Sequence, residues 1–174
     1  GSGDGNGERI MNPETEIEMA ENSYMEMETV QIKGVDSTIR KTNASLEAGA
    51  KLVVMERLMT HGKQRAESYF DVELNGEDCG ANIVSRSVAK NTSYQKFVSC
   101  LVGNAKCNGH TECDAIIMDH ANISAVPQLE ANHVEAALIH EAAIGKIAGE
   151  QITKLMTLGL TEAEAEEKIV DGFL

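Results

Sequence analysis

Apolar and polar residues alternate one by one along much of the chain, which is the period of a β-strand with one buried face. Clear examples are the segments 16–19, 25–28 and 70–74, in which Ile, Met, Phe, Val or Leu alternates with Glu or Asp. Short apolar runs follow at 52–55, 83–84, 97–98, 101–102 and 116–118, and Gly, Asn and Asp occupy the gaps. Residues 10–145 are therefore predicted to form one mostly β core.

Two β architectures fit this pattern. An antiparallel sandwich would use Asn75-Gly76 and Asn108-Gly109 as hairpin turns, whereas a parallel β-helix would stack each coil on the one before. Aromatic residues are only 3% of the chain and Trp is absent, so the interior must be filled by smaller side chains in regular layers. This favours stacked coils slightly, but the strands follow no strict repeat and periodicity leaves both architectures open.

The pattern becomes helical after Gly145, and residues 146–174 are predicted to form a small helical segment. A first helix is expected near 147–158, with Gly159 as its left-handed C-terminal residue. Thr161 and Glu164 then form a capping box that starts a second helix. The apolar stripe of this second helix either caps the open end of the β-structure or docks a partner; it consists of Ala165, Ile169, Val170 and Phe173.

Charge and composition exclude several functions. A net charge of −13 and a pI near 4.7 would repel phosphate backbones and anionic lipids, so neither nucleic acid nor membrane binding is expected. No apolar run reaches the roughly 20 residues of a membrane span, and no signal peptide is recognisable. The cysteines at 79, 100, 107 and 113 are spaced too unevenly for a disulfide framework, which indicates reduced thiols in the cytoplasm. Residues 1–9 are interpreted as a polar leader or an expression scar.

Two groups of residues have side chains that bind metals. Cys107, His110 and Cys113 offer soft and borderline ligands of the kind that hold zinc or iron–sulfur clusters, although the spacing matches no standard zinc motif. The alternative for Cys113 is a buried, inert thiol. His140 and Glu141 offer a nitrogen beside an oxygen, and the alternative for His140 is a hydrogen-bonded core residue on the face of Ala136 and Leu138. No phosphate-binding loop, nucleophile elbow or dinucleotide fingerprint is present, so nucleotide hydrolysis by this chain is not expected.

A series of motifs runs in order through the last third of the chain. They are ECDAIIMD at 112–119, VPQLE at 126–130, IHEAAIGKI at 139–147, GEQI at 149–152, LMTLGLT at 155–161 and IVDGF at 169–173. Together they resemble the C-terminal half of the SufB/SufD family of iron–sulfur cluster assembly proteins. The upstream strands resemble this family only in their general pattern.

The resemblance implies a fold and a role. The fold is a right-handed parallel β-helix followed by a small helical segment. The role is a non-catalytic scaffold that pairs through the C-terminal end of the β-helix and carries SufC-type ABC ATPases on residues 146–174. Movement of the ATPases opens the subunit interface, where a transient iron–sulfur cluster assembles. His140 and Glu141 match the His-Glu pair that this family uses in cluster assembly.

The chain departs from the family at one position. In larger members a cysteine before the Pro-x-x-Glu stretch receives sulfur, whereas this chain has Ala121 or Asn122 at the corresponding place. Cys113 is the expected substitute, and Cys107 is a further expected metal ligand. The chain resembles the short, minimal members of the family, which implies a homodimer, and it leaves the sulfur donor open. It also starts within β-pattern, so earlier coils are expected to be missing.

Two other functions remain as alternatives. A β-helix enzyme acting on carbohydrate or acyl substrates would need a cleft lined with carboxylates and basic residues, and the Glu-rich faces at 16, 18, 26 and 28 offer the carboxylates. A metal-binding interaction module would use Cys107, His110 and Cys113 and would bind metal without any ATPase.

Overall fold

The computed structural model describes residues 7–174, so most of the leader expected at 1–9 lies outside the described residues. The strands are β1 (Ile10–Met11), β2 (Glu14–Met19), β3 (Tyr24–Gln31), β4 (Ser37–Leu46), β5 (Lys51–Thr60), β6 (Arg65–Leu74), β7 (Cys79–Ala89), β8 (Tyr94–Gly103), β9 (Cys107–Ile117), β10 (Asn122–Ala131) and β11 (Ala136–Lys146). They are followed by α1 (Gly149–Met156) and α2 (Glu162–Phe173).

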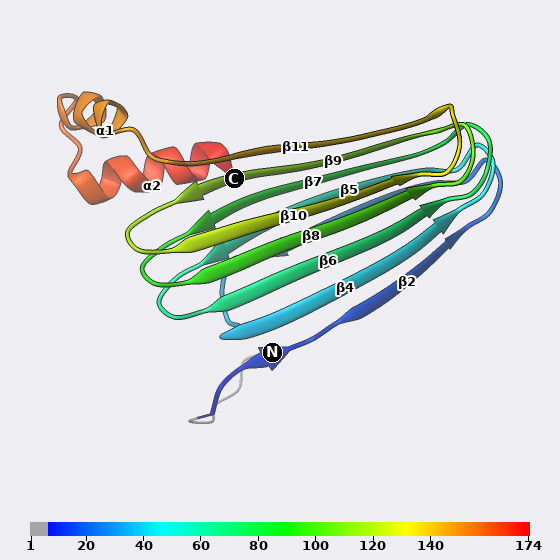
Figure 1. Ribbon diagram of the computed structural model, residues 1–174. Coiled ribbons are helices and arrows are strands. Elements are labelled where there is room, and N and C mark those ends of the chain that lie inside the picture. Colours follow the sequence, from blue (N-terminus) through cyan, green and yellow to red (C-terminus); the bar gives the residue numbers. More distant parts are fainter. Residues whose placement is uncertain (1–6) are drawn as a thin grey trace.

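The strands form two parallel sheets that face each other (Figure 1). Sheet A has the order β1-β4-β6-β8-β10, with β2 also beside β4, and sheet B has the order β11-β9-β7-β5-β3. Residues in register are 27 to 29 positions apart, as in the pairs Tyr24–Lys51 and Lys51–Gly80. Every strand pairing is parallel, which confirms the parallel β-helix and excludes the antiparallel sandwich.

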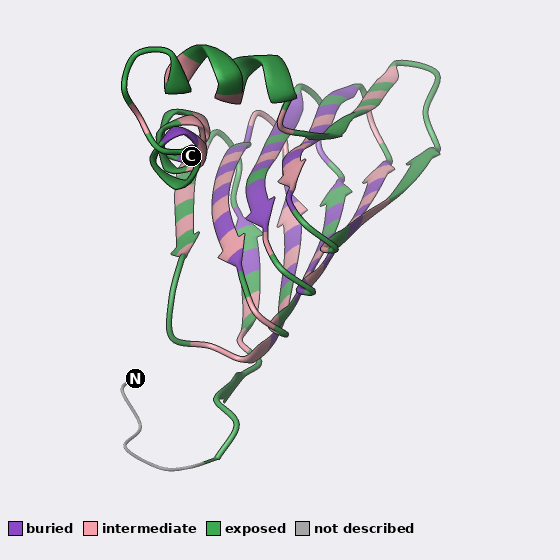
Figure 2. Ribbon diagram, turned by 90° about the vertical axis from the view of Figure 1, so that its left-hand side faces the viewer, coloured by how far each residue is buried: buried purple, intermediate pink, exposed green. Residues whose placement is uncertain are grey.

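The core lies between the two sheets, because alternate residues of each strand point inward (Figure 2). Leu46 and Leu74 are in register in neighbouring coils, and both are fully buried. Leu101, in the coil after that of Leu74, is also fully buried. Gly109 provides the space for these leucines, since a Cβ there would lie 2.9 Å from Leu101 and 3.0 Å from Leu74. Aliphatic side chains thus form regular layers in this part of the interior, as the low aromatic content indicated.

Asparagine side chains stack in the turns between coils. The Asn104 amide donates to Oδ1 of Asn75 at 2.7 Å, and the Asn132 amide donates to Oδ1 of Asn104 at 2.9 Å. Each of these residues follows a strand of sheet A, so the ladder fixes the register of three successive coils. Asn75 therefore belongs to a stack of asparagines and not to a hairpin turn, and the second expected hairpin, Asn108-Gly109, lies within β9.

Helix α2 lies against the outer face of sheet B, at the carboxyl ends of its strands, and α1 packs against α2 (Figure 1). Val170 of α2 is buried in a cluster with Val88 and Met118, against which Met59 and Ile116 also pack. The interpretation that this stripe caps the open end of the β-structure is therefore wrong. Both expected helix signals are confirmed: the capping box at Thr161 is formed, and Gly159 has a φ of +93°.

Candidate functional site

His140 lies in the middle of β11, and its ring points into the last coil of the β-helix. As the sequence alternative stated, it is on the same face as Ala136 and Leu138, in a strand that starts at Ala136 and runs on to Lys146. Nδ1 of His140 is 2.6 Å from Oγ1 of Thr111 on β9. Thr111 in turn lies 3.2 Å from Oγ of Ser99 on β8, so the histidine ends a short polar chain that crosses the interior.

The surroundings of His140 favour its neutral form. Burial lowers the pKa of the imidazole, and the charge of nearby His110 lowers it further. Phe97 is stacked near the ring, with centroids 6.5 Å apart. Nε2 is buried and has no hydrogen-bond partner among residues 7–174. A neutral imidazole with one unbonded nitrogen is suited to binding a borderline metal ion.

Glu141 projects from the opposite face of β11, onto the outer surface of sheet B, where it meets His110. Nε2 of His110 lies 3.2 Å from Oε2 of Glu141, and Nδ1 lies 2.8 Å from Oδ1 of Asn82 on β7. Because neighbouring residues of a strand face opposite ways, His140 and Glu141 of one chain do not converge on a single ion. Sequence reasoning grouped His110 with cysteines and missed this pairing, which spans 31 residues.

The cysteines of β9 point inward. Cys107 and Cys113 are both buried on the inner face, six residues apart and so separated by about 20 Å along the strand. His110 lies on the other face, and the structure does not bring the three together. Burial, followed by the charges of Glu56 and Asp114, raises the pKa of the Cys113 thiol to about 12. Cys107 also has a raised pKa because of burial, so both thiols are protonated at neutral pH.

A buried carboxyl group lies near Cys113. Glu56 of β5 occupies an inward position between Val54 and Leu58, where it accepts hydrogen bonds of 2.8 Å from the hydroxyls of Ser68 and Ser85. Burial raises the pKa of Glu56, against the lowering effect of both hydroxyls and of Arg40. Glu56 and Cys113 line the same internal cavity of about 10 Å³, which has room for about one water molecule. The sequence did contain a sign of this buried carboxyl group, because Glu56 takes the place of an apolar residue between the inward-facing Val54 and Leu58.

Comparison with known proteins decides the family. The model of the SUF system FeS cluster assembly SufBD core domain matches residues 6–173, which is nearly the whole chain. The chain belongs to the SufBD family. The resemblance found in the C-terminal motifs is thus confirmed, and the match also takes in the upstream strands.

Relatives with curated names agree with this assignment. An iron-sulfur cluster assembly SufBD family protein of Methanothermobacter thermautotrophicus is 43% identical over 105 residues, which are 59% of this chain and 26% of the relative. Proteins of the same name from Archaeoglobus fulgidus and Methanocaldococcus jannaschii are 41% and 36% identical over 105 and 104 residues. Those alignments cover 58% and 59% of this chain, and 28% and 33% of the relatives. The matched part of this SufBD protein therefore spans between a quarter and a third of their length.

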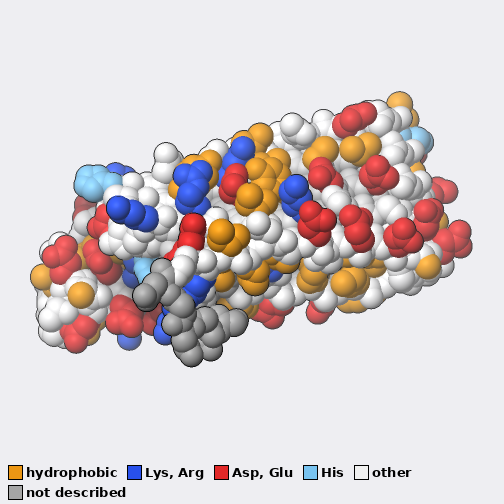
Figure 3. Space-filling model, turned by 90° about the horizontal axis from the view of Figure 1, so that it is seen from below, with side chains coloured by type: hydrophobic (Ala, Val, Ile, Leu, Met, Phe, Trp, Pro, Cys, Tyr) orange, Lys and Arg blue, Asp and Glu red, His pale blue; other side chains and the backbone are white. Residues whose placement is uncertain are grey.

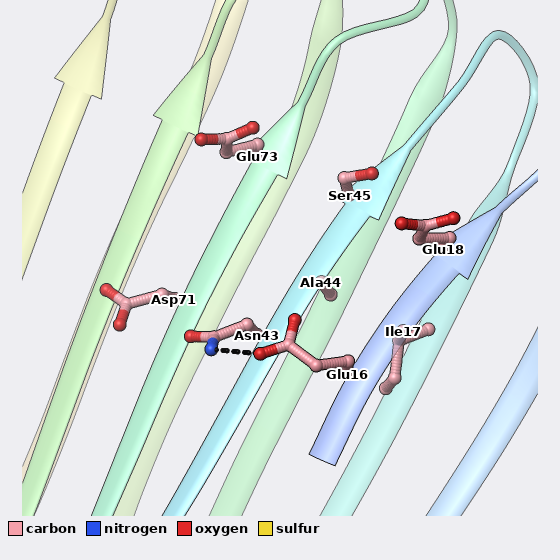
Figure 4. Close-up of a pocket in the computed structure, with 8 residues that line it drawn as sticks. All are labelled: Glu16, Ile17, Glu18, Asn43, Ala44, Ser45, Asp71 and Glu73. Carbon is pink, nitrogen blue, oxygen red and sulfur yellow. Dashed lines mark hydrogen bonds between the residues drawn. The ribbon is translucent and has the colours of Figure 1, made fainter. Parts of the chain in front are cut away.

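The Glu-rich face expected at 16 and 18 borders an acidic depression on sheet A (Figure 4). It has a volume of about 250 Å³, and its carboxylates come from Glu16, Glu18, Asp71 and Glu73. Glu16 accepts a 2.7 Å hydrogen bond from Asn43, and no Lys, Arg or His lines the depression. Seen from below, many acidic side chains cover the right-hand end of the molecule, and others lie at the left-hand end (Figure 3). Without a basic group the depression lacks the acid–base pairing expected of the β-helix enzyme, and it is better explained as a solvated acidic face.

Proposed function

We propose that this protein is a non-catalytic scaffold on which iron–sulfur clusters are assembled in the cytoplasm, and that it works with an ABC-type ATPase. The cluster is cargo that the scaffold passes on. The observation that carries the proposal is the uncovered last coil. Strands β10 and β11 each have a neighbour on one side only among the described residues, and β11 bears both His140 and Glu141. Neither of the described helices has both the length and the apolarity that a membrane crossing requires.

The last coil also supports pairing of two copies of the chain. Its apolar side chains are unusually open to solvent: Ile139 is 54% and Leu129 is 44% exposed, and Val126 and Ile144 are exposed as well. Open strand edges that carry apolar side chains are templates for pairing with another chain. A homodimer formed through β10 and β11 would bring two copies of His140 and Glu141 to one seam. Ligands on opposite faces of one strand would then reach a shared cluster from different subunits.

The helical segment supports docking of the ATPase. On α2, Ala165 and Val170 are buried, so little of the stripe singled out in the sequence is free for a partner. The end of α1 and the turn after it are different, since Met156 is exposed and Leu158 is 75% exposed. We therefore place the ATPase contact on Met156 and Leu158.

The docking proposal is tested by anaerobic affinity purification of the tagged protein from its host. An ABC-type ATPase is expected to co-purify with the wild type and to be absent from the Leu158→Asp preparation. Val134→Asp is the matched control, since Val134 is also an exposed apolar residue, 99% accessible, but lies in the turn before β11. Recovery of the ATPase with Leu158→Asp, or its absence from all three preparations, would contradict the proposal.

The pairing proposal is tested by light scattering after gel filtration. Ile139→Lys places a charge on the uncovered coil and is expected to halve the molar mass of the wild-type dimer, whereas Leu158→Asp should leave the mass unchanged. Anaerobic cluster reconstitution is expected to succeed on the wild type and on Leu158→Asp, and to fail on Ile139→Lys, His140→Ala and Glu141→Ala. A wild type that is monomeric yet assembles a cluster would contradict the shared seam.

A further inference from the structure

Three metal-binding side chains converge on the outer face of sheet B, away from the buried cysteines. His110 and Glu112 of β9 and Glu141 of β11 offer ligand atoms that all lie within 4.8 Å of one another. Glu112 and Glu141 are directly in register on neighbouring strands, and His110 lies two residues before Glu112 on the same face. The separations are short enough for one ion to contact all three side chains after small rotamer changes.

Asn82 prepares the imidazole of His110 for this role. Oδ1 of Asn82 accepts hydrogen bonds, so its position 2.8 Å from Nδ1 of His110 favours the tautomer with the proton on Nδ1. In the neutral ring Nε2 is then unprotonated, and it lies 3.2 Å from Oε2 of Glu141. Two electron pairs at this distance need a proton or a cation between them. A histidine whose second nitrogen donates to a carbonyl oxygen is the usual arrangement of a metal ligand.

The charges around the site also favour a cation, because negative side chains outnumber positive ones there. Like charges directly opposite on neighbouring strands repel each other, and here Glu112 faces Glu141. Asp114 adds a third carboxylate, and burial followed by Asp114 raises the pKa of Glu112. Within residues 7–174 neither Glu112 nor Glu141 forms an ion pair with a Lys or Arg. A bound cation would relieve this repulsion.

We propose that His110, Glu112 and Glu141 form a binding site for one divalent transition-metal ion. One nitrogen and two carboxylate oxygens suit Fe²⁺, and also Mn²⁺, Co²⁺ or Zn²⁺, better than the soft ions that thiolates select. Three protein ligands leave further positions open, and His110 also borders a hollow of about 410 Å³ lined by Val53, Gly80 and Ile139. This inference rests on the proposed function: the site receives ferrous iron, which then passes to the growing cluster.

The test is an anaerobic titration of the purified protein with Co²⁺, followed by absorption in the visible range, with Fe²⁺ as competitor. His110→Gln, Glu112→Gln and Glu141→Gln are each expected to weaken Co²⁺ binding at least about tenfold. His120→Gln and Glu135→Gln, which alter exposed turn residues of the same types, should bind as the wild type does. Asn82→Ala should weaken binding about 10- to 100-fold, and Asn82→Asp, which keeps an acceptor, should restore it.

Other results would overturn the site. One is unchanged affinity in the His110, Glu112 and Glu141 variants, and another is loss of binding in Cys113→Ser with binding kept in His110→Gln. Thermal unfolding without metal separates misfolding from ligand loss, since all variants should keep the wild-type midpoint within a few degrees. The titration needs no ATPase and no dimer. Failure of the metal site is therefore distinct from failure of the proposed scaffold function, which the purification and light-scattering experiments test.

Discussion

Replacement of Thr111 by Val would measure the polar chain that holds His140. Valine has nearly the same shape, so the change removes the hydroxyl that lies 2.6 Å from Nδ1 of His140 and 3.2 Å from Oγ of Ser99. Thr111 and Ser99 are fully buried. A buried polar group left without a partner costs about 1–3 kcal/mol. Ser99 and His140 would both lose their partner, and the cost is smaller for His140 because it is partly exposed. We expect Thr111→Val to lower the free energy of unfolding by about 2–4 kcal/mol.

The chain contains a matched control for this experiment. Thr38 is also buried on an inner face, but its Oγ1 has no hydrogen-bond partner within residues 7–174. Thr38→Val removes an unsatisfied hydroxyl and is expected to be neutral or to stabilise by about 1 kcal/mol. The measurement is urea unfolding followed by circular dichroism at one fixed protein concentration, with m-values compared. Equal effects of the two substitutions would refute the polar chain, as would a Ser99→Ala, Thr111→Val double variant whose cost is the sum of the single ones.

Three further outcomes are expected. Gly109→Ala should destabilise by about 1–3 kcal/mol in urea unfolding, because its Cβ would lie 2.8 Å from Leu138, whereas Gly145→Ala, with nothing within 4 Å, should not destabilise. Glu56→Gln should change the pH dependence of stability: the folded pKa is raised, so the wild type loses stability as pH rises above 4.5, and the variant, followed by thermal unfolding, should lack this loss. Thr161→Ala should speed hydrogen exchange in α2, since its cap contributes about 0.5–2 kcal/mol; equal exchange rates would contradict this.

The sequence predicted local features well, since they depend on near neighbours. The period of two holds along β9, where Cys113 and Ala115 are both buried, so the alternative of a buried thiol describes Cys113 better than the ligand role does. The capping box at Thr161 needs only the next three residues. The motifs around His140 and Glu141 were specific enough to indicate the family, which the family model confirms.

The sequence failed where an interaction joins distant residues. Alternating apolar and polar residues fit an antiparallel sandwich and a parallel β-helix equally well. The pattern shows that one face of a strand is buried, but it does not show which strand lies beside it. Val134 continued the alternation of β11 in sequence, yet it lies in the turn before the strand and is almost fully exposed. The stripe of α2 was recognised, but its position on the outer face of sheet B was not.

The sequence by itself determined the mostly β core, the alternation of inward and outward side chains within it, the helical end and the family. Tertiary structure alone decided which side chains meet, because neighbours in a coil are 27 to 29 residues apart in the chain. That register places His110 beside Glu141 and Thr111 beside His140. It also separates His140 from Glu141, two adjacent residues whose side chains the pleat of a single strand directs to opposite faces of one sheet.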